Sequence, residues 1–269
     1  MNLILIAGLP ATGKSRFASY LQQRLNIPLL CKDSMKEILF DTIGFQSHDE
    51  KTKLNHAALE SLYYAARQIL AAGSSVILEN NFEWYALPGL ERMIAAYGCE
   101  PITIFFGGDE RVIYRRYVER NADPTRHRGH VLSTCYPEKE NIGVIPEPIS
   151  LQEFQESFRK RGMSVFRIGE KRIDVDVFAR DGDLILRVAD NGDGVDPQVL
   201  QRLNAALRSG ESDSEQGHIG LLNIHSRICL LFGEGYGVFF LSAERGSCVE
   251  IRYPLGAAVK QEKTSGAGR

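Results

Sequence analysis

The sequence predicts an α/β fold in which a parallel sheet carries helices on both faces. Residues 3–7 form a continuous apolar run, which is typical of a strand buried on both sides. A glycine-rich segment follows at residues 8–15, and residues 16–25 then place apolar side chains at helical spacing. Further apolar runs of strand length lie at 27–31, 75–82 and 101–106. Because helical patterns separate these runs, we expect them to pair as parallel strands.

The glycine-rich segment, GLPATGKS, fits the pattern G-x-x-x-x-G-K-[ST] of a phosphate-binding loop. Its glycines let backbone N–H groups turn toward phosphate oxygens, and the helix that begins near Gly13 points its positive end at the same place. We expect Lys14 to reach the β- and γ-phosphates and the Ser15 hydroxyl to bind Mg²⁺. The residues expected at the nucleotide are Gly8, Ala11, Thr12, Gly13, Lys14 and Ser15. The position between a buried strand and a helix argues against an accidental glycine-rich turn.

Acidic residues stand at the ends of two predicted strands. Asp33 follows the run at 27–31, and Glu79 lies in the run at 75–82. Ligands of open α/β sheets bind at the carboxyl ends of strands. Asp33 is therefore a candidate base for the proton of an attacking hydroxyl, or the N-cap of a helix at 34–40, or both. Glu79 is a candidate partner of Mg²⁺, where Asp is the commoner residue, or a cap of the next helix.

Arginines occupy a predicted helix at 110–120 and the basic loop that follows it. Arginine supplies planar hydrogen-bond donors that suit phosphoryl oxygens. We expect Arg116, Arg120 and Arg126 to form a lid over the nucleotide. Within this lid Arg116 is expected to bind the nucleotide, and Arg120 and Arg126 to take part in catalysis.

Other charged residues of this region have simpler interpretations. Arg111 and Arg115 are expected on a solvated face of the helix. His127 and His130 lie in the basic loop, and no third metal ligand is evident near them in the sequence. We expect these histidines to bind substrate or to support the lid.

Three more helices are expected, at 49–72, 83–97 and 151–160, and Pro88 suits the first turn of the second. Trp84, the sole tryptophan, is interpreted as a packing residue in preference to a stacking platform for substrate. Short apolar runs at 163–168 and 172–177 are candidates to complete the sheet.

Composition limits the class of protein. The chain has 269 residues, of which 43% are hydrophobic and 25% charged, as in soluble globular proteins. A net charge of −2 gives no general attraction to nucleic acid or membrane. The five cysteines form no C-x-x-C pair, which favours a reducing, cytoplasmic location over a disulfide framework or a zinc site. No apolar run is long enough to span a membrane, and the first residues are interpreted as a strand, not a signal peptide.

The chain changes character after about residue 177. Residues 181–183, Asp-Gly-Asp, predict a hairpin turn between strands at 173–178 and 184–189. Residues 190–194 then alternate Asp, Asn and Gly. A calcium-binding EF-hand loop is excluded because its required Gly and Glu are absent at the sixth and twelfth positions.

Residues 1 to about 175 resemble the P-loop kinases of the AAA_33 and zeta-toxin-like group, relatives of polynucleotide kinase and chloramphenicol phosphotransferase. The features that carry the resemblance are the loop at 8–15, Asp33, the strand at 76–82, the helix at 116–120 leading into 126–130, and a closing strand pair at 166–175. The resemblance implies a three-layer P-loop NTPase sheet with helices on both faces. It also implies ATP or GTP as donor, Mg²⁺, and a hydroxyl of a small molecule or a polymer end as acceptor.

The remainder resembles the ATP-binding module of sensor histidine kinases of the LytS/YesM type, in the GHKL ATPase group. Residues 190–194, residues 217–224, Arg227 and a closing strand at 247–254 carry this resemblance. It implies that Asp190 holds the adenine amino group. It also implies nucleotide-lining glycines at Gly192, Gly194, Gly217 and Gly220.

One part of that module is missing from the sequence. The family has a preceding helix whose Asn binds Mg²⁺ together with the phosphates, and no apolar helix with an interior Asn precedes Asp190 at the required distance. No phospho-accepting His on a long dimerisation helix precedes it either. We therefore expect a partial, GHKL-like α/β sandwich that docks on the kinase half or on another copy. Nucleotide binding by this module is left open.

The expected organisation is a P-loop kinase domain at 1–175, the partial module at 176–257 and a disordered tail at 258–269. The expected function is an ATP-dependent phosphotransferase that moves the γ-phosphate to a hydroxyl of an unidentified acceptor. Two alternatives stay open: a histidine kinase-type signalling protein with its ATP site at Asp190, and a nucleotide-binding regulatory protein without turnover. Expected partners are the acceptor and, through the C-terminal module, a second copy or another protein; no membrane is expected.

Overall fold

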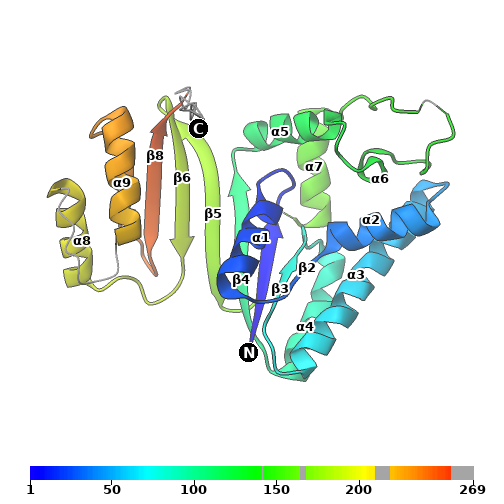
Figure 1. The fold of residues 1–269 in the computed structure, drawn as a ribbon, viewed down its shortest axis with the longest axis horizontal. Coiled ribbons are helices and arrows are strands. Elements are labelled where there is room, and N and C mark those ends of the chain that lie inside the picture. The colour runs from blue at the N-terminus through cyan, green and yellow to red at the C-terminus, as the bar shows by residue number, and fades with distance from the viewer. Residues whose placement is uncertain (141, 164–167, 210–218, 256–269) are drawn as a thin grey trace, which may run out of the picture.

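The computed structural model describes residues 1–140, 142–163, 168–209 and 219–255. The strands are β1 (Asn2–Gly8), β2 (Leu29–Cys31), β3 (Val76–Glu79), β4 (Glu100–Gly108), β5 (Lys171–Arg180), β6 (Asp183–Asp190), β7 (Gly237–Leu241) and β8 (Cys248–Pro254). The helices are α1 (Lys14–Leu25), α2 (Lys32–Ile43), α3 (His48–Ala71), α4 (Leu87–Tyr97), α5 (Glu110–Ala122), α6 (Arg128–Val131), α7 (Leu151–Arg161), α8 (Pro197–Ser209) and α9 (Ile219–Phe232). In this part of the chain the strands form one sheet in the order β2-β3-β1-β4-β5-β6-β8-β7 (Figure 1).

The first four strands are parallel, with β1 between β3 and β4. Helix α1 covers one face, where Ala18 packs with Ile4 and Ile6 of β1. Helices α3 and α4 cover the other face, where Leu62 and Leu90 join the larger core. The predicted parallel sheet with helices on both faces is therefore confirmed, and α1, α2 and α5 all begin at the carboxyl ends of its strands.

The segment at 83–97 shows how Pro88 sets the start of a helix and where Trp84 packs. The helix expected at 83–97 is divided into a 3-10 turn, η1 (Trp84–Ala86), and α4, with Pro88 in the first helical turn. Proline is tolerated there because the first N–H groups of a helix have no partner inside it. Trp84 packs over Gly162, where an added Cβ atom would come within 2.2 Å of the indole. This contact agrees with a packing role for the tryptophan.

Strand β5 belongs to both halves of the sheet. It pairs in parallel with β4, from Ile102↔Lys171 to Gly108↔Val177, and antiparallel with β6 along its other edge. The boundary expected at residue 175 falls inside this strand, so the backbone has no division there. The reason is hydrogen bonding: β5 satisfies the open edge of β4 and offers its own second edge to the hairpin partner.

The predicted hairpin at 181–183 is present, because the chain turns between β5 and β6 with positive φ at Asp181 (52°) and Gly182 (86°). Beyond it, α8 and α9 pack on β7 and β8 through Leu207, Leu222 and Val238. Two helices on one face of antiparallel strands give the partial α/β sandwich that the sequence predicted.

The register places these helices on the same side of the sheet as α1. Val175 pairs with Val188, and Val188 pairs with Val249, so all three side chains share one face. Val175 packs against the core under α1, and Val249 packs against the core under α8 and α9.

Some expectations lie outside the described residues. They are most of the strand at 163–168, residue Gly217 and the tail at 258–269. Among the described helices, none is both long and apolar enough to cross a membrane.

A continuous sheet predicts that damage at one end is felt at the other. Val238 on β7 is 2% exposed, and Val238→Ala should lower the free energy of unfolding by about 1–3 kcal/mol. Because Trp84 is the sole tryptophan and lies in the first half, its fluorescence should report the same lowered midpoint in urea as circular dichroism does. The matched control is Val144→Ala at a 59% exposed site, which should leave both midpoints unchanged. Two separate transitions would contradict one cooperative sheet.

Candidate nucleotide-binding and phosphoryl-transfer site

The loop at 8–15 leaves β1 in a conformation that turns its backbone inward. Gly8, Ala11 and Gly13 have positive φ values of 120°, 62° and 98°. A side chain at Gly8 would collide with β4, because its Cβ atom would lie 2.1 Å from the Phe106 carbonyl oxygen. The loop can therefore pass close to β4 only with glycine at this position.

Helix α1 begins directly after the loop. Gly13 is its N-cap and supplies no side-chain hydrogen bond to the first turn. The N–H groups of that turn are available to an anion, and the helix dipole favours negative charge there. The adjoining cavity, of about 290 Å³, is lined by Ala11, Gly13, Lys14, Ser15, Arg16, Arg116 and Arg120.

Lys14 is only 5% exposed, and its Nζ atom donates a hydrogen bond to the Leu9 carbonyl oxygen at 2.7 Å. Burial lowers the pKa of Lys14 to about 8, although the nearby carboxylates of Glu79 and Asp33 oppose this shift. The ammonium group is thus held inside the loop, beside the first turn of α1, where the motif places it.

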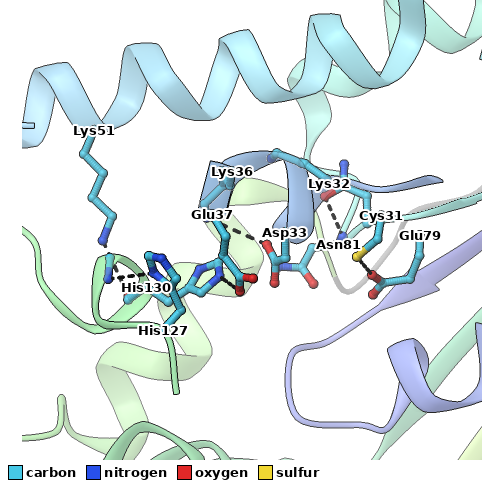
Figure 2. Close-up of polar contacts among 12 residues, drawn as sticks. Cys31, Lys32, Asp33, Lys36, Glu37, Lys51, Glu79, Asn81, His127 and His130 are labelled. Atoms are coloured by element: carbon cyan, nitrogen blue, oxygen red, sulfur yellow. Dashed lines mark hydrogen bonds and ion pairs between the residues drawn. The ribbon is translucent and has the colours of Figure 1, made fainter. Parts of the chain in front are cut away.

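Glu79 ends β3 and is 5% exposed. Its Oε1 atom accepts a hydrogen bond from Ser15 Oγ at 3.2 Å, and its Oε2 atom accepts one from Cys31 Sγ at 2.7 Å. Figure 2 shows the thiol of Cys31 directed at this carboxylate. The next helical elements, η1 and α4, have Glu83 and Ala86 as their N-caps, so Glu79 caps neither of them. Glu79 lies instead beside the Ser15 hydroxyl.

The Ser15–Glu79 pair suits a Mg²⁺ ion. Mg²⁺ prefers oxygen ligands and is commonly bound by one or two protein groups together with phosphates and water. A hydroxyl and a buried carboxylate supply two such oxygens, and the described residues contain no cluster of three or more His, Cys, Asp or Glu that suits a metal ion. The donor set thus fits an ion that arrives with a nucleotide.

Cys31 is a residue of the site that the sequence alone does not identify. It lies opposite Glu79 in the parallel pairing of β2 with β3, and burial followed by the Glu79 charge raises the pKa of its thiol to about 12. The group stays a neutral thiol that donates to Glu79. The contact depends on how β2 pairs with β3, which the sequence does not show. The sequence does show that Cys31 ends a predicted strand, where ligand-binding residues of parallel sheets commonly lie.

Asp33 is the second residue of α2, which begins at Lys32 and has Cys31 as its N-cap. The expectation that Asp33 caps a helix at 34–40 is therefore wrong, because the helix starts earlier. Lys36 Nζ lies 3.8 Å from Asp33 Oδ1. Burial would raise the pKa of Asp33, but the cations of Lys36, Arg126 and Lys32 outweigh it and hold this pKa well below its usual range.

The arginines separate into three groups. Arg116 and Arg120 line the cavity beside the loop at 8–15. Arg115 is 71% exposed at its side chain, and Arg111 is also exposed, as the sequence predicted. Arg126 lies in the segment between α5 and α6 and lines a second cavity, which Arg120 also lines.

The two histidines hold α6 against α2. His127 Nε2 lies 3.1 Å from Asp41 Oδ1, and His130 Nε2 lies 2.8 Å from Glu37 Oε1. His127 Nδ1 also accepts a hydrogen bond from the Gly129 N–H at the start of α6. Burial lowers the pKa of His130 to about 3, so its ring is neutral and donates to Glu37. These contacts join α6 and the residue before it to α2, and neither histidine belongs to a metal cluster within the described residues.

In the second half, Asp190 Oδ1 accepts a hydrogen bond from the Gly192 N–H at 2.8 Å. Gly192 and Gly194 line a cavity of about 550 Å³ between the end of β6 and the segment joining β7 to β8. Asp190 is not part of that lining, and Gly220 lies in the first turn of α9. Gly217 lies outside the described residues. Of the five predicted residues, the structure therefore brings together Asp190, Gly192 and Gly194, through the hydrogen bond and the cavity lining.

The geometry defines an α/β protein with a phosphate-binding loop at the carboxyl end of β1, an inner strand of the parallel sheet. Residues 3–134 match the AAA domain family model. Residues 162–257 match the family of Histidine kinase-, DNA gyrase B-, and HSP90-like ATPases. Both resemblances expected from the sequence are thus confirmed, and the second match begins before β5.

One curated protein and two solved structures that resemble this chain each share less than 30% sequence identity with it. The sensor histidine kinase YpdA of Escherichia coli is 29% identical over 107 residues, which are 40% of this chain and 18% of that protein. Among solved structures, a candidate kinase from Chloroflexus aurantiacus is 27% identical, with 60% of this chain and 97% of that chain covered and a TM-score of 0.47. A gluconokinase from Sinorhizobium meliloti is 14% identical, with 65% and 82% covered and a TM-score of 0.38.

If Ser15 and Glu79 hold Mg²⁺, Glu79→Gln should weaken binding of a non-hydrolysable ATP analogue in the presence of Mg²⁺ by about tenfold or more. The substitution replaces an anionic carboxylate oxygen with a neutral amide oxygen, which is a weaker ligand of Mg²⁺. Without Mg²⁺ the affinities of the two proteins should agree within a factor of about two, as measured by calorimetry. Glu83→Gln, beside the same β3–α4 connection, is the control. Equal loss with and without Mg²⁺ would contradict the metal role.

Proposed function

We propose that this chain is an ATP-dependent phosphotransferase that moves the γ-phosphate of ATP to a hydroxyl group of an acceptor. The observation that carries the proposal is the contact between Ser15 on the loop and the buried carboxylate of Glu79, beside the enclosed Lys14. This arrangement supplies donors for the phosphates and oxygens for Mg²⁺ in one place.

Each group has a role in this proposal. The loop N–H groups and Lys14 bind the β- and γ-phosphates, and Arg116 and Arg120 stabilise the negative charge of the transferred group. Mg²⁺, held by Ser15 and Glu79, neutralises phosphate charge when it is bound.

Asp33 binds the hydroxyl group of the acceptor. Its low pKa keeps it ionised at neutral pH, so it accepts a hydrogen bond from the acceptor hydroxyl and orients it. The hydroxyl oxygen forms a bond to the γ-phosphorus as the bond to the bridging oxygen breaks. The hydroxyl proton passes to the Asp33 carboxylate, and ADP leaves with the bridging oxygen.

Similarity to a histidine kinase gives a second candidate, an ATP site at Asp190. The match over residues 162–257 and the hydrogen bond from Gly192 to Asp190 favour it. Against it, the helix before β5 in the described chain is α7, which contains no asparagine and packs on the core beside α5. The P-loop site has its phosphate donors and oxygens together, so we prefer it.

Loss of the ammonium group tests the donor site. Lys14→Ala should lower the rate of nucleotide turnover by about 10²–10³-fold, because a preorganised donor to the developing charge is removed. Asp190→Ala should leave turnover within a factor of about two. Turnover is followed by release of ADP in a coupled assay. Retained activity in Lys14→Ala combined with loss in Asp190→Ala would transfer the function to the second half.

Loss of the base tests the acceptor site. Asp33→Asn should lower kcat for phosphoryl transfer by about 10²–10⁴-fold and leave the dissociation constant of Mg-ATP unchanged. Because the pKa of Asp33 is depressed, its carboxylate stays ionised as the pH falls, and the wild-type rate should show no acid limb at the usual pKa of an aspartate, about 4. Initial rates between pH 4 and 8 measure this. An unchanged kcat in Asp33→Asn would remove Asp33 from the mechanism.

A further inference from the structure

A second cavity, of about 450 Å³, lies between α2 and the segment that joins α5 to α6. It is lined by Glu37, Arg120, Asp123, Thr125, Arg126 and His127. Its charged groups are therefore two carboxylates and two guanidinium groups, which differ in how they are paired.

Both carboxylates already have partners. Glu37 Oε1 lies 2.8 Å from His130 Nε2. Asp123 Oδ1 accepts hydrogen bonds from the Thr125 N–H at 2.8 Å and from Thr125 Oγ1 at 2.7 Å. Neither carboxylate forms a hydrogen bond or ion pair with an arginine of the cavity among the described residues: Glu37 is paired with α6, and Asp123 with its own turn.

The arginines have no such partners. Neither the Arg120 nor the Arg126 guanidinium forms a hydrogen bond or ion pair with any residue that the structure describes. The Nε atom of Arg126 is fully buried and has no acceptor. An unpaired buried donor on a charged group costs free energy, which an anion in the cavity would recover.

Several cations lie close enough to Arg126 to influence one another's pKa values. Burial lowers the pKa of Arg126 and the charge of Arg120 lowers it further, and these two effects outweigh the opposing charges of Asp33 and Glu37. The pKa of Lys51 is lowered to about 8 by burial and by the charges of Lys36 and Arg126. These cations repel one another, and an anion bound among them would offset the repulsion.

The cavity is also in the right place for an acceptor. Arg120 lines both this cavity and the cavity of the phosphate loop, so the two adjoin. Asp33 lies between the Glu79–Cys31 pair and the two histidines, on the face of α2 that carries Glu37 (Figure 2). We propose that this cavity binds an anionic group of the acceptor, so that the acceptor is an alcohol bearing a phosphate or a carboxylate group.

The inference rests on the proposed phosphotransferase function. In it, Arg126 holds the anionic group of the acceptor, and this anchors the hydroxyl at Asp33. Arg120, which lines both cavities, stays with the transferred phosphoryl group. The anion itself keeps all its bonds during transfer. A neutral alcohol lacks the anchor and leaves Arg126 unpaired, so the cavity selects against it.

The test begins with calorimetry of a non-hydrolysable ATP analogue and Mg²⁺, which examines the donor site alone. Inorganic phosphate and sodium acetate are then titrated separately into the complex saturated with the analogue, so that the loop at 8–15 is already filled. We expect at least one of the two anions to bind with a millimolar dissociation constant, and the tighter one to identify the group. Arg126→Gln should weaken that binding at least tenfold, and Arg126→Lys should restore part of it.

The matched control is Arg115→Gln on the exposed face of α5, which should leave anion binding unchanged. Circular dichroism establishes that each variant is folded. No heat with the analogue would remove the phosphotransferase proposal. Normal binding of the analogue without any anion binding, or with equal anion binding by Arg126→Gln, would overturn the acceptor inference alone. Tenfold weaker binding of the analogue by Arg126→Gln would also overturn it, because Arg126 would then serve the nucleotide.

Discussion

The hydrogen bonds of Glu79 connect the elements from which the site is built. One carboxylate oxygen binds the hydroxyl of Ser15 on α1, and the other binds the thiol of Cys31 at the end of β2. These contacts exist because β3 pairs with β1 at Ile6↔Glu79 and with β2 at Cys31↔Glu79. Backbone pairing of three parallel strands therefore fixes where a buried negative charge meets the phosphate loop.

That charge also explains the state of its surroundings. Burial raises the pKa of the neighbouring Cys31 thiol and the Glu79 charge raises it further, while the same charge opposes the lowering of the Lys14 pKa by burial. The groups that donate hydrogen bonds to the buried Glu79 carboxylate are a hydroxyl and a thiol, both neutral, and a buried carboxylate without a directly paired cation is costly. The site therefore suits a ligand that brings both signs of charge, and the proposed Mg²⁺ and nucleotide are such a ligand.

Local patterns were enough to predict much of the fold. The apolar run before Gly8, the helix after Gly13 and the hairpin at Asp181-Gly182 each depend on residues close together in the chain. The contacts that no local pattern encodes were missed. Cys31 meets Glu79 through strand register, and His130 meets Glu37 across 93 positions of sequence.

The two halves show the same limit. Each half carries its own motifs, and the sequence predicts a division between them at about residue 175. Strand β5 instead pairs with β4 along one edge and β6 along the other, so one strand completes the parallel sheet and opens the antiparallel part. Backbone hydrogen-bonding groups line both edges of any strand, so the sequence of β5 does not specify which strands will pair with it. The boundary therefore depends on tertiary pairing.

The most direct measurement is a crystal structure of the intact chain grown with Mg²⁺ and a non-hydrolysable ATP analogue. The account predicts the triphosphate against the backbone of residues 8–15, with the metal ion bonded to Ser15 Oγ and close to Glu79. An analogue bound only in the cavity near Gly192 and Gly194, with the loop at 8–15 free of phosphate, would contradict it.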